Sequence, residues 1–371
     1  MRDWEKAVLG ILTSLEERVD AWKYRLRARL GKGNPIIILP YQGFGTAKKL
    51  YLKGRVLEDK KIAVSGKKDR FWDNLANMYK RFQSDEIPHA RILARFQGFE
   101  KLLRADEEGF FEVEFEPAHP LPEDRLWHTI DLELIAPQRQ DQPPARAQGQ
   151  VLVPPSDAEF GVISDIDDTV LHTQTANPLR MARNLFLGNA YTRLPFPGVA
   201  AFYQSLMRGS RGDSHNPIFY VSSSPWNIYD LLTEFFRLQE IPFGPLLFLR
   251  DWGLTREELL PTSHHRHKLE TISRILGLFN DLSFILIGDS GQEDPEIYTQ
   301  VIRDHPGRVL AIYIRNVTRQ PQRIAAIQSQ SEEAAAMGIP LLLARDTLAM
   351  AHHAAENKWI SPDTLAAFND F

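Results

Sequence analysis

Between residues 156 and 320, short apolar runs alternate with longer segments in which apolar residues recur every three or four positions. The first pattern is typical of buried β-strands, and the second is typical of amphipathic helices. Strands and helices that alternate in this way form βαβ units, whose helices cover both faces of a parallel sheet. The sequence therefore predicts an α/β domain in the second half of the chain. The expected strands contain FGVIS, PIFYVSS, PLLFL, SFILIG and RVLAIYI.

Polar and charged residues follow four of these five strands. Ligands of an open parallel sheet bind outside the carboxyl ends of its strands, so these residues are candidates for one shared site. A single acidic residue after a strand would mean little, because aspartate is also common in turns and helix caps. The residues are Asp165, Asp167 and Asp168 in DIDDT, Ser222 and Ser223 in SSSPW, Lys268 in HKLETI, and Asp289 and Asp294 in GDSGQED.

The chemistry of these side chains fits phosphoryl transfer. Clustered carboxylates repel one another, so a divalent cation, Mg²⁺, is expected among them. Asp165 can attack phosphorus as a nucleophile, and Asp167 can serve as general acid and base. Asp289 and Asp294 supply further oxygen ligands for the metal. Lys268 can neutralise charge that develops at the transferring group.

The same motifs contain further polar residues, whose expected roles differ. The hydroxyl of Ser222 is expected to hold a phosphoryl oxygen, and at least one hydroxyl among residues 222–224 is expected only to cap the helix entry before Pro225. Asp168 is expected to cap or support the loop rather than bind metal. The stretch HHRHK, residues 264–268, lacks the spacing of a zinc site, so we expect an exposed basic loop beside the phosphate site.

In order and spacing, these motifs resemble those of haloacid-dehalogenase (HAD) superfamily phosphatases over roughly residues 160–318. DIDDT resembles the D-x-D-x-T nucleophile motif, and GDSGQED resembles the metal motif. The resemblance implies a HAD-like Rossmannoid sheet and an aspartyl-phosphate at Asp165. It also implies substrate binding by Thr169, Ser222 and Ser223. The implied metal ligands are Asp165, Asp289, Asp294 and Asp167, the last through its main-chain carbonyl.

The sequence is further similar to the actin-patch-associated phosphatidate phosphatase family of fungi and its bacterial relatives. This similarity covers about residues 36–318. It rests on SSSPWNIY and IGDSGQEDPEIY and on the upstream stretches YQGFGT, GRVLED and DEEGFFEV. It implies Mg²⁺-dependent removal of phosphate from phosphatidate to give diacylglycerol. Two alternatives stay open. One is a phosphatase for a soluble phosphomonoester, and the other is a non-catalytic relative that binds lipid or protein.

The domain organisation follows from changes in pattern along the chain. Residues 1–33 form one amphipathic helix, and 34–155 form a smaller β-rich domain, a sandwich or barrel, with short alternating strands. Residues 156–371 form the catalytic domain, which has a helical C-terminal tail. A short insertion at 172–198 stands where HAD enzymes carry a cap. It either packs in the ordinary way or forms a small lid or lipid-facing entrance, and its shortness favours a large or surface-presented substrate.

Composition excludes several classes of protein. The 371 residues contain 44 Lys and Arg against 48 Asp and Glu, a net charge of −4, which argues against a nucleic-acid partner. The absence of cysteine excludes disulfides and thiol chemistry. No secretory signal or membrane-spanning stretch is evident, so we expect a cytoplasmic protein.

The helix expected at residues 1–31 allows two interpretations. Its apolar stripe can pack on this chain or on another copy, or it can lie on a membrane with its basic second half against anionic headgroups. We therefore expect weak, reversible contact with anionic membranes, together with a phosphomonoester substrate. The sequence leaves the oligomeric state open.

Overall fold

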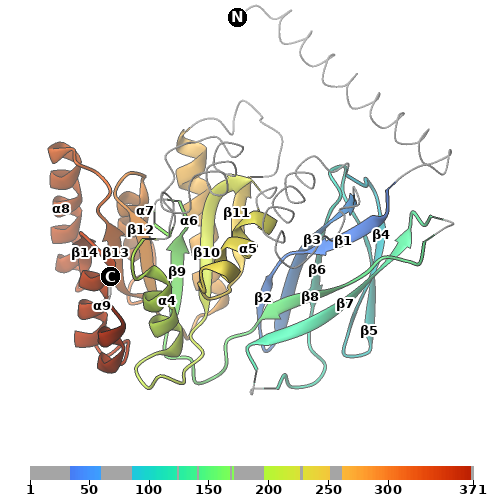
Figure 1. Cartoon of the computed structure of the whole chain (residues 1–371), viewed down its shortest axis with the longest axis horizontal. Helices are drawn as coiled ribbons and strands as arrows, with labels where there is room; N and C mark the ends of the chain where they lie inside the picture. Colours follow the sequence, from blue (N-terminus) through green and yellow to red (C-terminus); the bar gives the residue numbers. More distant parts are fainter. Residues whose placement is uncertain are drawn as a thin grey trace, which may run out of the picture.

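The computed structural model describes residues 34–59, 86–122, 125–139, 142–167, 169–170, 196–225, 229–250 and 261–368. These residues form two sheets that lie side by side, as Figure 1 shows. The chain completes the β-rich sheet before it enters the α/β sheet. The expected helix at 1–33 and most of the insertion at 172–198 lie outside the described residues.

The second half of the chain forms a parallel sheet, as predicted. Among the described residues it has six strands in the order β11-β10-β9-β12-β13-β14, and every neighbouring pair is parallel. The central strand β9 lies between β10 and β12 and is buried along its whole length, because its apolar side chains face helices on both sides. The strands are β9 (Gly161–Asp165), β10 (Ile218–Pro225), β11 (Leu246–Arg250), β12 (Phe284–Asp289), β13 (Val309–Arg315) and β14 (Leu341–Ala344).

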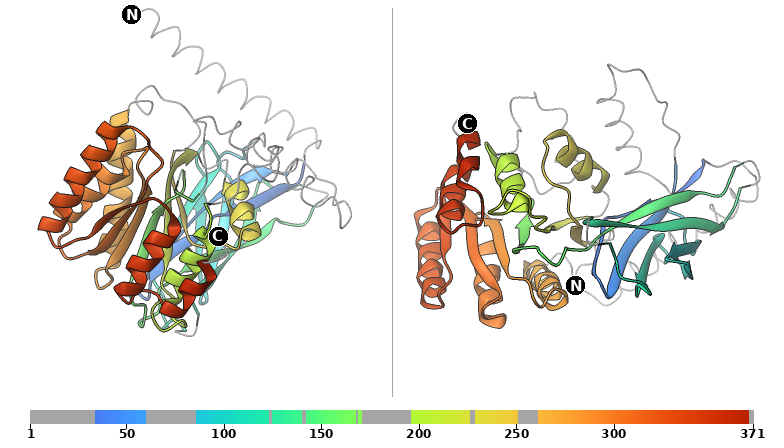
Figure 2. Two further views of the ribbon diagram at one scale, coloured as in Figure 1. Left: turned by 60° about the vertical axis from the view of Figure 1, so that its left-hand side comes forward. Right: turned by 90° about the horizontal axis from the view of Figure 1, so that it is seen from below.

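Helices cover both faces of this sheet and divide its core in two (Figure 2). One face packs against α4 (Val199–Arg208), α5 (Tyr229–Leu238), α9 (Thr347–Glu356) and the short 3-10 helix η2 (Pro362–Phe368). The other packs against α6 (Pro261–Leu278), α7 (Asp294–Asp304) and α8 (Pro321–Ala336). The C-terminal tail is helical apart from β14, which joins the sheet edge, as expected from its sequence.

The β-rich half forms a mainly antiparallel sheet of eight described strands. Its order is β1-β3-β2-β8-β7-β4-β5, and β6 pairs with the free side of β3. Only the pairing of β2 with β8 is parallel. Alternate side chains of β4 and β6 are buried, which is the pattern that a sheet with one solvated face requires. The strands are β1 (Ile36–Pro40), β2 (Gly43–Thr46), β3 (Lys49–Glu58), β4 (Arg91–Phe96), β5 (Phe99–Arg104), β6 (Phe110–Phe115), β7 (Trp127–Ala136) and β8 (Arg146–Leu152).

The start of β2 joins the two halves. Phe44 is buried against the core of the α/β sheet, where its ring meets Phe219 edge-on at 6.1 Å between centroids. The ring of Tyr41 lies 4.6 Å from that of Tyr229, and the backbone N–H of Gln42 donates to the Tyr229 hydroxyl at 2.8 Å. Tyr229 is the first residue of α5, so the β-rich half contacts the segment that follows the Ser222 strand end.

Membrane-spanning helices are absent from the described part of the chain, since none of its helices is both long and apolar enough.

Candidate active site

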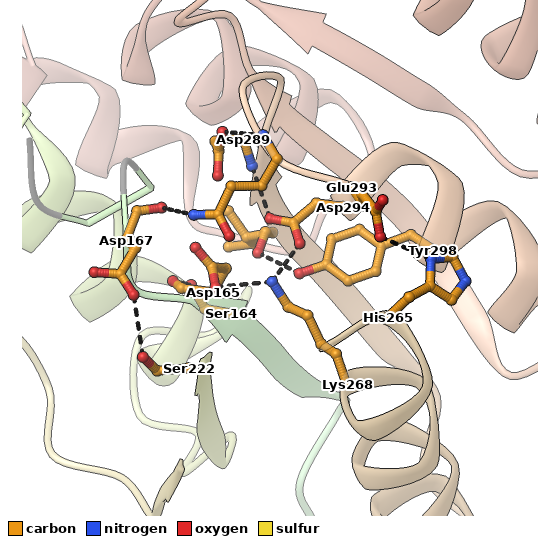
Figure 3. A network of polar contacts seen from close by, with 12 residues as sticks. Ser164, Asp165, Asp167, Ser222, His265, Lys268, Asp289, Glu293, Asp294 and Tyr298 are labelled. Atoms are coloured by element: carbon orange, nitrogen blue, oxygen red, sulfur yellow. Dashed lines mark hydrogen bonds and ion pairs between the residues drawn. The ribbon is translucent and has the colours of Figure 1, made fainter. Parts of the chain in front are cut away.

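The carboxyl ends of two neighbouring strands place Asp165 and Asp289 next to each other. Asp165 is the last residue of β9 and Asp289 the last of β12, and these strands pair in parallel. Both side chains are buried, with Asp165 only 1% exposed. Asp294 begins α7 and Lys268 projects from α6 towards the same point, as Figure 3 shows. Four residues from three separate stretches of the sequence therefore meet at one edge of the sheet.

Lys268 joins two of the carboxylates. Its Nζ atom lies 2.8 Å from Asp165 Oδ1 and also donates to Asp294 Oδ1 (Figure 3). The side chain of Lys268 is 3% exposed, so both ion pairs are shielded from water. A buried ammonium between two carboxylates neutralises part of their repulsion and fixes their positions.

The turn from Asp289 to Asp294 fixes the remaining acids. Asp289 Oδ1 accepts from the backbone N–H of Gly291 at 2.6 Å and of Gln292 at 3.0 Å. The backbone N–H of Asp289 in turn donates to Asp294 Oδ2 at 3.1 Å. A β-carbon at Gly288 would lie 2.4 Å from that same Asp294 oxygen, so this close approach requires glycine.

Burial controls the ionisation of the cluster. Burial, opposed by Lys268 and reinforced by the neighbouring carboxylates, holds the pKa of Asp165 well above its ordinary value. Burial and the charge of Asp294 raise the pKa of Asp289 to about 7. Burial alone would lower the pKa of Lys268, but its ion pairs with Asp165 and Asp294 outweigh burial and raise that pKa. The lysine is therefore cationic, and a further positive charge would favour full ionisation of the acids.

The acidic cluster fits a divalent cation. One carboxylate oxygen from each of Asp165, Asp289 and Asp294 lies within 4.8 Å of the others, and all three side chains are buried. Asp165 Oδ2 and Asp289 Oδ2 are buried oxygens without a hydrogen-bond partner. A set of hard carboxylate oxygens with unused lone pairs matches the ligand preference of Mg²⁺.

The carboxylate of Asp167 lies apart from the three grouped carboxylates. Its Oδ2 atom accepts from the Ser222 hydroxyl at 3.1 Å, so the carboxylate is turned towards the end of β10 (Figure 3). Its main-chain oxygen accepts from the side-chain amide of Gln292 at 3.4 Å. Asp167 is therefore not one of the three grouped carboxylates, because its side chain pairs with Ser222 on the other side of the site.

Thr169, the predicted threonine of the DIDDT motif, lies beside the end of β13. Thr169 is buried and its Oγ1 atom has no hydrogen-bond partner, while its main-chain oxygen accepts from Arg315 Nε at 3.1 Å. Arg315 is the last residue of β13, and the sequence predicted no role for it. The side chain of Ser223 and residue Asp168 lie outside the described part of the structure.

The HHRHK stretch is helical rather than a loop. Residues 264–268 lie within α6, which begins at Pro261, a residue whose fixed backbone angle suits the first helical position. Because helical residues three apart share a face, His265 lies on the side of Lys268, and its Nδ1 atom is 3.2 Å from Glu293 Oε2. Arg266 and His267 are exposed.

A family of known proteins matches much of the α/β half of the chain. Residues 160–316 match the family model "Phosphatidate phosphatase APP1, catalytic domain". The match begins just before β9 and ends just after β13, so it contains every residue of the carboxylate–lysine cluster.

Two curated proteins are similar to the chain. Phosphatidate phosphatase APP1 of Saccharomyces cerevisiae is 37% identical over 157 residues, which is 42% of this chain and 26% of the yeast protein. An uncharacterised protein of Schizosaccharomyces pombe is 25% identical over 246 residues, 64% of this chain and 39% of that protein. The chain thus spans well under half the length of either relative.

Similarity to solved structures is weak. A carbohydrate acetylesterase from Xanthomonas citri aligns with 81% of this chain and 65% of its own at 11% identity, with a TM-score of 0.30. Overlap at this level carries no argument about fold or function.

Proposed function

We propose that this chain is a Mg²⁺-dependent phosphatidate phosphatase that releases phosphate from a lipid phosphomonoester. The observation that carries the proposal is the match of residues 160–316 to a phosphatidate phosphatase catalytic domain, because that span contains the clustered acids and Lys268. The proposal includes the chemistry of HAD superfamily phosphatases, because the order and spacing of the motifs resemble theirs.

Asp165 is the proposed nucleophile. Its carboxylate attacks phosphorus, the bond from phosphorus to the leaving oxygen breaks, and an aspartyl-phosphate forms on Asp165. Its end-of-strand position and its bond to Lys268 hold the attacking carboxylate in one orientation. Lys268 also offsets the negative charge of the phosphoryl group, from a position where its side chain is 3% exposed.

Asp167 is the proposed general acid and base. It donates a proton to the leaving alkoxide in the first step. In the second step it takes a proton from the water that attacks phosphorus, the bond from Asp165 to phosphorus breaks, and inorganic phosphate leaves. Its hydrogen bond from Ser222 orients it away from the buried cluster and towards the β10 side of the site. Thr169, Ser222 and Ser223 are the proposed donors to phosphoryl oxygens.

Asp165, Asp289 and Asp294, with the main-chain oxygen of Asp167, are the proposed ligands of Mg²⁺. The bound ion would supply positive charge that offsets the repulsion between these carboxylates and a phosphate group.

A screen of phosphate release tests the substrate. The purified chain is assayed with Mg²⁺ against phosphatidate in mixed micelles and against soluble phosphomonoesters such as sugar and nucleotide phosphates. We expect the highest kcat/KM with phosphatidate. Higher efficiency with a soluble compound would replace the lipid substrate by the second candidate, and no phosphate release from any compound would favour a non-catalytic relative.

Contact with a lipid surface is a separate part of the proposal. Residues 1–31 are basic in their second half, and Arg266 is exposed on α6 two residues before the proposed catalytic lysine. Positive charge at these places would attract anionic headgroups. We expect weak co-sedimentation with phosphatidate-containing liposomes that declines as salt rises. Salt-independent sedimentation, or none, would contradict this electrostatic contact.

A further inference from the structure

Arg323 holds the turn that carries two carboxylates of the site. It lies in the first turn of α8, and its Nε atom donates to the main-chain oxygen of Ser290 at 3.0 Å. Its Nη2 atom donates to the main-chain oxygen of Gln292 at 2.5 Å. Both carbonyls belong to the turn between Asp289 and Asp294, so one guanidinium restrains that turn from the outer side.

Glu296 fixes the orientation of this guanidinium. Arg323 Nη2 lies 2.9 Å from Glu296 Oε2, and Nη1 pairs with Glu296 Oε1. The two-point pair is 23% exposed at Arg323 and 33% at Glu296, so it is partly shielded. Only a planar guanidinium can meet a carboxylate at two points and still donate to two carbonyls. Arg323 therefore connects α7, α8 and the turn between β12 and α7.

Gln292 carries this restraint into the site. The main-chain oxygen of Gln292 accepts from Arg323, and the backbone N–H of Gln292 donates to Asp289 Oδ1 at 3.0 Å. Its side-chain amide donates to the main-chain oxygen of Asp167 at 3.4 Å. A shift of Gln292 would therefore move one carboxylate and one carbonyl that we assign to the metal.

We propose that Arg323 is a positioning residue that sets the affinity of the acidic cluster for a divalent cation. The proposal rests on the metal site of the proposed function. Its competitor is a purely structural role, in which the Arg323–Glu296 pair only ties α7 to α8. A second pair between the same helices separates the two roles. Arg303 Nε lies 2.6 Å from Glu333 Oε1, and these side chains are 46% and 41% exposed.

The experiment measures Mn²⁺ binding to the full chain by electron paramagnetic resonance, because Mn²⁺ prefers the same oxygen ligands as Mg²⁺. The proteins are the unchanged chain, Arg323→Ala, Arg323→Lys and Arg303→Ala. We expect Arg323→Ala to weaken binding by about tenfold or more, as loss of groups that orient metal ligands commonly does. Arg323→Lys should fall between, since lysine keeps the charge without the fork. Arg303→Ala should bind as the unchanged chain does.

Thermal unfolding without metal, measured on the same proteins, completes the test. If Arg323→Ala lowers the melting temperature but keeps its Kd for Mn²⁺, the role is structural and the proposal is overturned. If the unchanged chain itself binds no Mn²⁺, the metal site and this inference fall together. Should Arg323→Ala not fold, Arg323→Lys decides alone, and an unaltered Kd there overturns the proposal.

Discussion

Lys268 Nζ lies 2.8 Å from Asp165 Oδ1 and forms a second ion pair with Asp294, in a place almost closed to water. The same ammonium therefore supports the fold and stands beside the proposed nucleophile. Removing one partner of a buried ion pair leaves the charge of the other uncompensated. Replacement of Lys268 should therefore lower the stability of the protein.

Lys268→Met should lower the free energy of unfolding by about 3–5 kcal/mol at pH 7.5. The loss should shrink towards pH 5.5. The folded-state pKa of Asp165 already lies above its unfolded value, and loss of the Lys268 charge that opposes burial raises it further. The folded variant therefore takes up the proton more readily than the unchanged chain does, and it gains more stability as pH falls. Urea unfolding at both pH values measures this. The matched control is Lys49→Met, whose ion pair with Glu114 is 47% exposed at the lysine and should cost at most about 1 kcal/mol.

Asp165→Asn should reduce phosphate release by at least about 1,000-fold, because an amide is a poor nucleophile and loss of a nucleophile removes most of the catalytic effect. The control is Asp213→Asn, at a carboxylate that is 81% exposed in a surface loop, and it should keep full activity. Turnover near the unchanged level in Asp165→Asn would refute the assigned nucleophile.

Asp167→Asn should slow the second step and let phosphorylated protein accumulate, because the group that activates water is lost. Mass spectrometry of acid-quenched reactions would detect the added phosphate. Asp165→Asn should show no such adduct under the same conditions. An adduct that is equally abundant in both variants would place the phosphate on another residue.

The affinity for Mg²⁺ should fall as pH decreases from 8 to 6. Asp289 has a pKa of about 7, so a proton competes with the metal over this range. Competition by one proton at that pKa predicts a Kd about tenfold higher at pH 6 than at pH 8, measured by isothermal titration calorimetry. A Kd that does not change with pH would show that Asp289 is already ionised at pH 6 or does not bind the metal.

Phe44→Ala should destabilise the protein by about 3–5 kcal/mol, since it opens a cavity where the β-rich half meets the core of the α/β sheet. Phe99→Ala on β5 is the matched control, because that ring is 52% exposed and its loss should cost about 0.5 kcal/mol. Chemical denaturation measures both. Equal effects would mean that Phe44 contributes no more than a surface ring.

The sequence predicted the parallel sheet and the strand ends at which its polar residues cluster. The spacing of apolar residues along a strand indicates whether one or both of its faces are buried. This pattern can be read from the residues of the strand alone. The placement of Asp165, Asp289, Asp294 and Lys268 follows from it, because parallel strands bring their carboxyl ends to one edge.

Other parts of the site depend on contacts between distant segments. Arg323 is 31 residues from Gln292 and carries no strand-end or motif signal, so its hydrogen bond to that turn was not predicted. The hydrogen bond from the Ser222 hydroxyl to the Asp167 carboxylate joins two strand ends, and it was not predicted either. The HHRHK stretch was expected to be a loop, but the helix that begins at Pro261 includes it.

The pattern of residues along the chain was enough to predict the parallel sheet, the edge where its polar residues lie and the acids that the chemistry needs. The contacts between distant segments became known only from the folded chain: the β-rich half packs Phe44 into the core of the α/β sheet, and Arg323 holds the Asp289–Asp294 turn. The two kinds of interaction differ in how far they act along the chain. Periodicity and capping act within a few residues along the chain, whereas a hydrogen bond between α8 and the turn after β12 exists only once α7 and α8 have packed on the sheet.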